Sequence, residues 1–267
     1  MHNRRCSLRR ALSEGRLLLG PFCKLATPQN MEIFGYAGFD FVILDCEHGP
    51  LSAETVENLV RAAKVTGLHA LVRVPHNEPA SIDRILDVGA AGIIVPRIST
   101  AEEARKLACA ARYAPDGERG LCRYVRAAKY SKMDRYQYLK EANRDVLVIA
   151  MIESAEGFGN LPGILATKGI DAIFVGPYDL SQSLGIPGQV DAPEVEHMMT
   201  TIVSQAHRAG VATATFVESP EGAKKWADVG VQMISYSTDV GIMLQASIGI
   251  VRSVRRMLMD KGSVARI

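Results

Sequence analysis

The sequence predicts a (β/α)8 barrel, the α/β fold in which eight parallel strands alternate with helices around one core. Eight short apolar runs recur along the 267 residues, and a segment with helical periodicity follows each of them. The runs are continuous rather than alternating, which is typical of strands buried on both faces. Eight evenly spaced units in about 250 residues favour closure into a TIM barrel.

The expected strands follow one another at regular intervals. They cover residues 17–25, 41–47, 69–74, 92–98, 146–153, 172–179, 212–218 and 233–239. Between the second and third strands, Ser52 suits a helix N-cap and Gly67 a helix end. The apolar face of that helix is formed by Val56, Leu59, Val60 and Ala63. Segments 100–112 and 193–210 have the same helical pattern.

A doubly wound sheet is the alternative fold, but no G-x-G-x-x-G motif follows the first expected strand. No break in composition marks a second domain, so we expect one domain over residues 1–267. Residues 1–14 are rich in arginine and are expected to form a basic N-terminal extension or a solvated helix. The longest irregular stretch, 114–133, is expected to cover one mouth of the barrel.

Composition excludes several classes of function. The net charge of +2 and the lack of a basic block with interleaved aromatics give no reason to expect nucleic acid. No apolar run approaches the roughly 18 residues that a membrane span needs. The five cysteines are scattered without a C-x-x-C pair, which argues against a disulfide framework or structural zinc and favours a cytoplasmic location.

Polar residues end most of the expected strands, and TIM-barrel chemistry is carried at the C-terminal ends of the strands. If the barrel closes, these side chains converge on one mouth. In chain order they are Asp45, Glu47, His48, Arg73, Arg97, Glu153, Asp179, Glu218 and Asp239.

Glu153 and Asp179 end adjacent expected strands, so their carboxylates can approach each other. Two carboxylates without cysteine or paired histidines suit a hard divalent ion, with water and substrate completing its coordination. Such an ion would bind a chelating substrate and polarise its carbonyl. The alternative is that one or both carboxylates only cap a helix.

Three further side chains are candidates for chemical roles. Arg73 lies in an apolar strand, where it either pairs with Asp45 or holds a substrate carboxylate or developing oxyanion. His48 is a candidate general base oriented by Asp45, or else an ordinary surface histidine. Lys24 is a candidate Schiff-base lysine, although the carboxylate pair already offers a metal route.

Longer motifs resemble a known family. GFDFVILDCEHGP, LVRVP, ILDVGAAGIIVPRISTAEEA, GERG, MIES and FVGPYDLSQSLG together are similar to the HpcH/HpaI aldolase/citrate lyase family of class II pyruvate aldolases. The resemblance runs from about Gly15 to about Val254. It implies reversible cleavage of a 4-hydroxy-2-oxo acid to pyruvate, or an analogue, and an aldehyde through a metal-bound enolate. The implied metal is Mg²⁺, Mn²⁺ or Co²⁺.

The resemblance also implies roles for single residues. Glu153 and Asp179 match the metal-binding carboxylates, and His48 matches the general base with Asp45 in support. Arg73 matches the arginine that steadies the enolate. The loop that contacts pyruvate through its backbone corresponds to Gly176, Pro177, Tyr178 and Asp179.

Asp87 matches an acid that raises the basicity of the histidine. In the expected barrel Asp87 lies at the wrong mouth for its own His48, so a neighbouring subunit would supply it. The family forms hexamers, as trimers of dimers, with swapped C-terminal helices, and the resemblance implies such a homo-oligomer here.

Three positions depart from the common family pattern. Met151 stands where glutamine is frequent, and Tyr178 where a small residue is frequent, so the phenol could narrow the mouth. Arg97 stands where an apolar residue is common. We expect Arg97 to recognise an acidic tail on the substrate or its aldehyde half, the alternative being a salt bridge with a loop acid. Met151 belongs to the expected substrate contacts.

Two other functions fit the same residues less specifically. A metal-dependent 2-oxo acid decarboxylase or a CoA-ester lyase would use the same constellation, although no adenine-nucleotide groove is evident in the sequence. A non-catalytic barrel is opposed by the presence of the five residues Asp45, His48, Arg73, Glu153 and Asp179.

Overall fold

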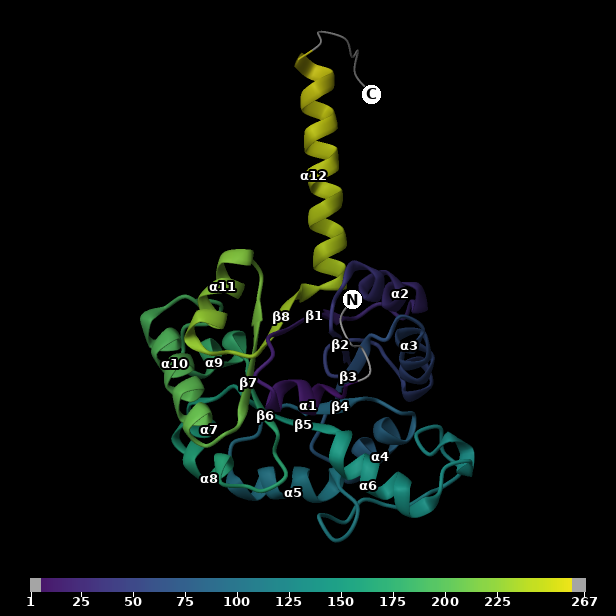
Figure 1. Cartoon of the computed structure of the whole chain (residues 1–267). Coiled ribbons are helices and arrows are strands. Elements are labelled where there is room, and N and C mark those ends of the chain that lie inside the picture. Colours follow the sequence, from purple (N-terminus) through teal and green to yellow (C-terminus); the bar gives the residue numbers. More distant parts are fainter. Residues whose placement is uncertain (1–5, 261–267) are drawn as a thin grey trace.

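The computed structural model describes residues 6–260, which form a closed barrel of eight parallel strands and confirm the predicted fold (Figure 1). The strands are β1 (Leu18–Cys23), β2 (Phe41–Asp45), β3 (His69–Arg73), β4 (Gly92–Val95), β5 (Leu147–Ile152), β6 (Ala172–Val175), β7 (Ala212–Val217) and β8 (Met233–Thr238). Each strand pairs with the next one in the chain, and β8 pairs with β1.

Helices alternate with the strands and surround the barrel. They are α1 (Leu8–Ser13), α2 (Pro28–Ala37), α3 (Ala53–Thr66), α4 (Pro79–Asp87), α5 (Ala101–Ala111), α6 (Arg135–Asp145), α7 (Ala155–Gly159), α8 (Leu161–Leu165), α9 (Pro177–Ser183), α10 (Pro193–Arg208), α11 (Pro220–Val229) and α12 (Asp239–Asp260). A short 3-10 helix, η1 (Lys129–Ser131), precedes α6. In α3 the expected caps are present, because the Ser52 side chain accepts from the Thr55 amide and Gly67 ends the helix with a φ of 77°.

The strands are buried on both faces, as their continuous apolar runs predict. Alternate residues of a strand point to opposite sides, so each strand contributes to two apolar clusters. The cluster inside the barrel includes Phe41, Ile43, Leu71, Ile94, Ile149 and Phe174. The cluster between strands and helices includes Val42, Leu44, Val72, Ile93, Val148 and Ile173.

Helix α1 closes the barrel at the end where the strands begin. Leu8, Ala11 and Leu12 are buried and belong to the cluster inside the barrel. The expectation of a solvated helix within residues 1–14 is therefore wrong for the apolar face of α1, because this face packs against the apolar interior of the barrel. Residues 1–5 lie outside those that the structure describes.

The expected strands run past the observed strand ends, and two of them do so by three residues or more. The strand expected at 172–179 ends at Val175, and Pro177 begins α9, so Asp179 lies in the first turn of a helix. Proline suits this position because it has no N–H to pair and its φ is already helical. The fourth strand ends before Arg97, which lies in the following loop.

The irregular stretch 114–133 lies beside the end of α4. The Ala127 amide donates to the Asp87 carbonyl at 2.9 Å, and Arg126 Nη1 donates to the Val88 carbonyl at 2.8 Å. Because α4 runs directly into β4, this contact places the stretch at the end of the barrel where the strands begin. In its own chain it therefore does not cover the mouth at which the strands end.

Helix α12 projects away from the barrel (Figure 1). Many of its apolar side chains are exposed, among them Met243, Leu244, Ile250, Val251, Val254, Met257, Leu258 and Met259. Apolar residues gathered on one helix are typical of a surface that a partner covers. None of the helices within residues 6–260 combines the length and apolar character that crossing a membrane requires.

Candidate active site

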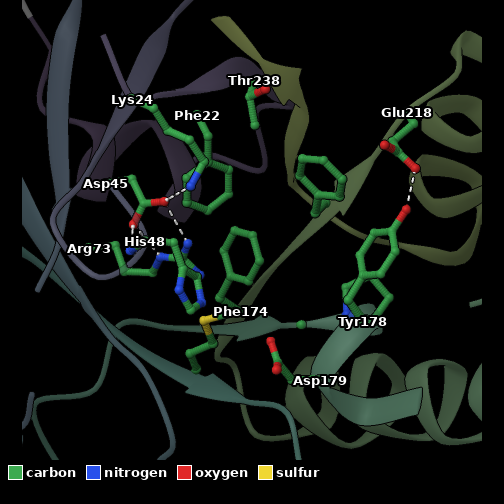
Figure 2. A pocket seen from close by; sticks show the side chains of 14 residues that line it. Phe22, Lys24, Asp45, His48, Arg73, Phe174, Tyr178, Asp179, Glu218 and Thr238 are labelled. Carbon is green, nitrogen blue, oxygen red and sulfur yellow. Dashed lines mark hydrogen bonds and ion pairs between the residues drawn. The ribbon is translucent and has the colours of Figure 1, made fainter. Parts of the chain in front are cut away.

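A cavity of about 320 Å³ opens at the end of the barrel where the strands terminate (Figure 2). It is lined by Phe22, Lys24, Asp45, His48, Arg73, Met151, Phe174, Gly176, Pro177, Tyr178, Asp179, Phe216, Glu218 and Thr238. Most of the predicted site residues are among these. Glu153, Arg97 and Asp87 are not part of this lining, and each is placed separately below.

Asp45 and Arg73 end neighbouring strands and face each other in the β2–β3 register. Arg73 Nε and Nη2 donate to the two carboxylate oxygens of Asp45 at 2.9 and 2.8 Å. Asp45 has no exposed surface, and the backbone amides of Glu47 and His48 also donate to it. Burial by itself would raise the pKa of Asp45, but the bonds from Arg73 and Lys24 outweigh it and hold the pKa below its ordinary value.

Arg73 therefore has the structural partner that one of its two interpretations requires, and it still faces the cavity. Its guanidinium lies over the Phe22 ring at 4.8 Å from the centroid, and Nη1 is 3.3 Å from Glu47 Oε2. The arginine is 7% exposed, so its position is set by these contacts. A rigid guanidinium at the cavity wall can bind a carboxylate or a developing oxyanion without a large loss of side-chain entropy.

Lys24 directly follows β1 and reaches into the same cavity. Its Nζ is 2.6 Å from Asp45 Oδ2, on the oxygen that also accepts from Arg73. Its backbone amide donates to Asp239 Oδ1 at 3.0 Å, and Asp239 is buried. Asp239, which was expected to end the eighth strand, is the first residue of α12 and fixes the backbone at Lys24. Lys24 thus forms an ion pair with Asp45, a contact that its interpretation as a Schiff-base lysine does not include.

His48 is the most exposed of the predicted catalytic side chains, at 54%. Within the described part of the chain, Asp45 accepts from the backbone amide of His48, and the imidazole has no hydrogen bond to Asp45. The oxygens of Asp45 accept from Arg73, Lys24 and the loop amides, so in this structure Asp45 positions the backbone at His48, and a role in orienting the ring stays a prediction. The carboxylate nearest to the ring is Glu47, whose Oε2 is 3.9 Å from His48 Nε2.

Glu153 follows β5 and is buried, with 6% of its surface exposed. Its Oε1 accepts a hydrogen bond of 2.8 Å from the backbone amide of Arg97. Burial raises the pKa of Glu153 to about 7, against the effect of this bond, and the charges of Asp179 and Glu47 raise it further. A buried acid next to two other acids is the arrangement that a bound cation would stabilise.

The backbone at Gly176 approaches Glu153 closely. A Cβ atom at Gly176 would lie 2.9 Å from Glu153 Oε2 and 2.7 Å from the Met151 methyl carbon, so only glycine fits there. Gly176 is followed by α9, whose first turn carries Asp179 on the cavity wall. Asp179 lies close enough for its charge to act on Glu153. Residues 6–260 contain no cluster of three or more His, Cys, Asp or Glu side chains that could hold a metal.

Arg97 contributes its backbone to the site more directly than its side chain. It has a φ of 59°, in the left-handed region that non-glycine residues rarely adopt, and this conformation accompanies the amide's bond to Glu153. The guanidinium is 74% exposed, and its Nη2 is 3.4 Å from Glu47 Oε1. Glu47 is thus the loop acid of the alternative interpretation, and only the arginine side of this pair is exposed, since the Glu47 side chain is 8% exposed.

Asp87 lies at the C-terminal end of α4, at the opposite end of the barrel from the cavity. Its Oδ1 accepts from Arg119 Nη2 at 2.8 Å, and Arg119 is itself 6% exposed and stacks on the Tyr113 ring. Asp87 therefore does not reach His48 of the same chain. Its side chain is held in place by a buried arginine of the GERG motif.

Several lining residues were missed by the sequence analysis. Phe22, Phe174 and Phe216 form an aromatic layer with ring centroids 5.9 and 6.0 Å apart, and Thr238 lies beside them. The phenylalanines sit within apolar strands, where nothing distinguishes a cavity residue from a core residue. The Tyr178 hydroxyl donates to Glu218 Oε2 at 2.5 Å. This hydrogen bond is the main reason why the pKa of Tyr178 is raised to about 12.

A closed barrel whose C-terminal mouth carries acids, an arginine and a histidine defines a TIM-barrel enzyme that acts on a small molecule. Residues 18–246 match the model of the family described as HpcH/HpaI aldolase/citrate lyase. The chain belongs to this family, as its motifs predict.

Named relatives agree with this assignment. The chain is 33% identical over 237 residues to a 5-keto-4-deoxy-D-glucarate aldolase of Klebsiella pneumoniae, covering 89% of this chain and 92% of the relative. It is 34% identical over 239 residues to a hydroxypyruvate/pyruvate aldolase of Roseobacter denitrificans, covering 89% and 93%. A solved HpcH/HpaI family structure from Burkholderia cenocepacia superposes with a TM-score of 0.89 at 34% identity, covering 93% of this chain and 98% of the other.

Proposed function

We propose that this protein is a metal-dependent pyruvate aldolase, which reversibly cleaves a 4-hydroxy-2-oxo acid to pyruvate, or an analogue, and an aldehyde. The observation that carries the proposal is one cavity that brings Asp179, with Glu153 behind it, together with the Arg73–Asp45 pair and His48. The aldolase names of the two relatives support the reaction class.

Glu153 and Asp179 would hold the divalent ion. The fit rests on the buried carboxylate of Glu153, whose raised pKa reflects a charge that the protein solvates poorly and that a cation would compensate. Oxygen donors suit Mg²⁺, Mn²⁺ and Co²⁺, and two carboxylates do not select strongly among them. When bound, the ion would be chelated by the carboxylate and keto oxygens of a 2-oxo acid and would polarise the carbonyl.

The remaining groups bind and orient the 2-oxo acid. Arg73 would place its guanidinium beside the keto oxygen, where negative charge develops as the C3–C4 bond breaks. The close approach of the backbone at Gly176 and Pro177 would bring the amides of Tyr178 and Asp179 against the substrate carboxylate. Met151 lines the cavity between these groups and would contact the pyruvate unit.

His48 would remove the proton of the C4 hydroxyl, directly or through a water molecule. Its exposed imidazole can reach substrate in the cavity, and Asp45 fixes the backbone of the loop that carries it. We propose that Asp87 of a neighbouring subunit raises the basicity of this imidazole. Arg119 would hold that carboxylate in place for the neighbour.

The cross-subunit role of Asp87 requires an assembly, and we propose a homo-oligomer in which α12 packs on another subunit. The exposed apolar side chains of α12 support this packing. A hexamer, built as a trimer of dimers with exchanged C-terminal helices, would provide both contacts. We propose one catalytic domain over residues 1–267 and a cytoplasmic location, which the free cysteines within residues 6–260 support.

Arg97 is proposed to recognise an acidic tail on the substrate or its aldehyde half. The support is the exposure of its guanidinium, and the buried carboxylate of Glu47 that it contacts at 3.4 Å is also paired with Arg73. This arrangement leaves Arg97 able to turn towards a substrate carboxylate. Its backbone amide would continue to hold Glu153.

Decarboxylation of a 2-oxo acid is the second candidate reaction, because it needs the same chelation and the same arginine. A CoA-ester lyase is less well supported, since the part of the chain from 6 to 260 shows no basic groove among the cavity residues beyond Lys24, His48 and Arg73. A non-catalytic barrel would not need the buried acid Glu153 near Asp179 and an ion-paired arginine.

The test is a panel of 4-hydroxy-2-oxo acids and oxaloacetate, with pyruvate release coupled to lactate dehydrogenase, with and without EDTA. We expect pyruvate and an aldehyde from at least one 4-hydroxy-2-oxo acid, loss of activity with EDTA, and recovery with Mn²⁺ or Mg²⁺. Release from oxaloacetate alone would favour the decarboxylase. Cleavage that resists EDTA and is trapped by borohydride would contradict the metal route and point to Lys24.

A further inference from the structure

Tyr178 and Glu218 stand between two cavities. Besides the cavity of about 320 Å³, a smaller one of about 130 Å³ lies on the other side of these residues. The lining of both cavities includes Pro177, Tyr178, Phe216 and Glu218. The two spaces are therefore neighbours that are separated by side chains.

The side chain of Tyr178 is held in its dividing position by two contacts. Its hydroxyl donates to Glu218 Oε2 at 2.5 Å, and its ring makes an edge contact with Phe216 at a centroid distance of 6.1 Å. Figure 2 shows the tyrosine and the glutamate facing each other across the cavity from Asp45 and Lys24. Because Tyr178 is 44% exposed, no dense packing prevents it from moving or from being shortened by mutation.

The expected positions of the two substrate halves rest on the proposed aldolase function. If the 2-oxo acid occupies the part of the cavity near Arg73 and Asp179, the aldehyde half has the part lined by the phenylalanines and Tyr178. A volume of about 320 Å³ is at the lower end of the range for ligand pockets. A long aldehyde would therefore meet the Tyr178 ring.

We propose that the Tyr178–Glu218 pair limits the length of the aldehyde half, and that the cavity behind it, whose lining does not include Arg97, is a subsite for an uncharged tail. Apolar walls are supplied there by Val190, Met199, Val217 and Trp226. The charged residues of that lining are Asp191 and Glu218, and it contains no lysine, arginine or histidine from the described part of the chain. A carboxylate tail would meet like charges, whereas an alkyl or hydroxyalkyl tail would not.

The experiment measures kcat/KM for the addition of pyruvate to propanal, pentanal and glutaric semialdehyde. The rate is determined from the amount of 4-hydroxy-2-oxo acid that forms. Pentanal and glutaric semialdehyde have the same number of carbons and differ in the terminal charge. The variants are Tyr178→Ala and Tyr178→Phe, with Tyr136→Ala as a control for loss of an exposed tyrosine on α6. The readout is the ratio of two aldehydes on one variant, in which a general loss of activity cancels.

We expect the pentanal-to-propanal ratio to rise about ten-fold in Tyr178→Ala, the gain expected when two more methylene groups are buried. Tyr178→Phe, which keeps the ring and loses the bond to Glu218, should give a smaller rise, and Tyr136→Ala none. Glutaric semialdehyde should gain less than pentanal in Tyr178→Ala.

Two outcomes would overturn the inference separately from the function. Unchanged pentanal-to-propanal ratios in both Tyr178 variants, with propanal reacting normally, would show that the pair is no barrier. Equal gains for pentanal and glutaric semialdehyde would show that the second cavity does not discriminate by charge. Failure of every variant and of the wild type to react with any of the three aldehydes would instead overturn the aldolase function and this inference with it.

Discussion

Replacing Glu153 by glutamine is expected to abolish metal-dependent activity and, in the absence of metal, to make the protein more stable. Burial raises the pKa of Glu153 from 4.5 to about 7, so the ionised side chain disfavours the folded state. Each unit of difference between the pKa values of the folded and unfolded protein corresponds to about 1.4 kcal/mol. Above pH 7 the ionised side chain therefore lowers the free energy of unfolding by about 3 kcal/mol. Glutamine keeps an oxygen to accept from the Arg97 amide and carries no charge to bury.

The sign of the pH dependence follows from the raised pKa. Below pH 4.5 the side chain is neutral in both the folded and the unfolded protein, and it costs the folded state nothing. Between pH 4.5 and 7 it ionises only when the protein unfolds, so the stability of the wild type falls as pH rises. The stability advantage of Glu153→Gln should therefore grow by about 2 kcal/mol between pH 5 and pH 8.

The assay is urea denaturation with EDTA at pH 5 and pH 8, at one fixed protein concentration because assembly contributes to apparent stability. Glu156→Gln, an exposed position in α7, is the matched control and should show no such trend. Added Mn²⁺ should stabilise the wild type and leave Glu153→Gln unchanged. A Glu153→Gln protein that is less stable at pH 8, or a difference independent of pH, would refute the reasoning.

Three further predictions concern the other site residues. His48→Asn should lower kcat by about 100-fold or more, the range for loss of a general base, while the thermal shift produced by Mn²⁺ stays as in the wild type; loss of that shift would place His48 at the metal instead. Mixing and reassembling His48→Asn subunits with Asp87→Asn subunits should restore activity that neither variant has alone, because some interfaces of the mixed oligomer contain an intact His48 and an intact Asp87. No recovery in confirmed mixed oligomers would contradict the cross-subunit role. Arg97→Ala should weaken kcat/KM for a dicarboxylic substrate about two- to five-fold more than for a neutral one, as befits an exposed charge pair, and equal losses would sink the proposed recognition of an acidic tail.

The barrel was predictable because each of its strands is written as a continuous apolar run, and only a strand covered on both faces tolerates one. The exact strand ends were less accessible. Asp179 was assigned to a strand although Pro177 is a common first residue of a helix and could have indicated α9. The apolar spacing of Leu8, Ala11 and Leu12 likewise indicated a buried face on α1, which the arginines around it obscured.

The candidate site was predictable in its members and less so in its contacts. Asp45 and Arg73 end adjacent strands, and their pairing follows once the register is known. The contact of Lys24 with the Asp45 carboxylate does not follow from the register, because Lys24 comes from the end of β1, a different part of the chain. Which of several nearby donors reaches a carboxylate depends on side-chain geometry that residue spacing does not encode.

At Arg97 the backbone and the side chain have separate functions. Its backbone amide holds the buried acid Glu153, and any residue that tolerates a positive φ, such as glycine or asparagine, would preserve that hydrogen bond. Its side chain points into solvent beside the cavity and carries no part of that bond. Substrate preference can therefore drift at this position through evolution, or be redesigned in the laboratory, while the chemistry of the neighbouring acid is left intact.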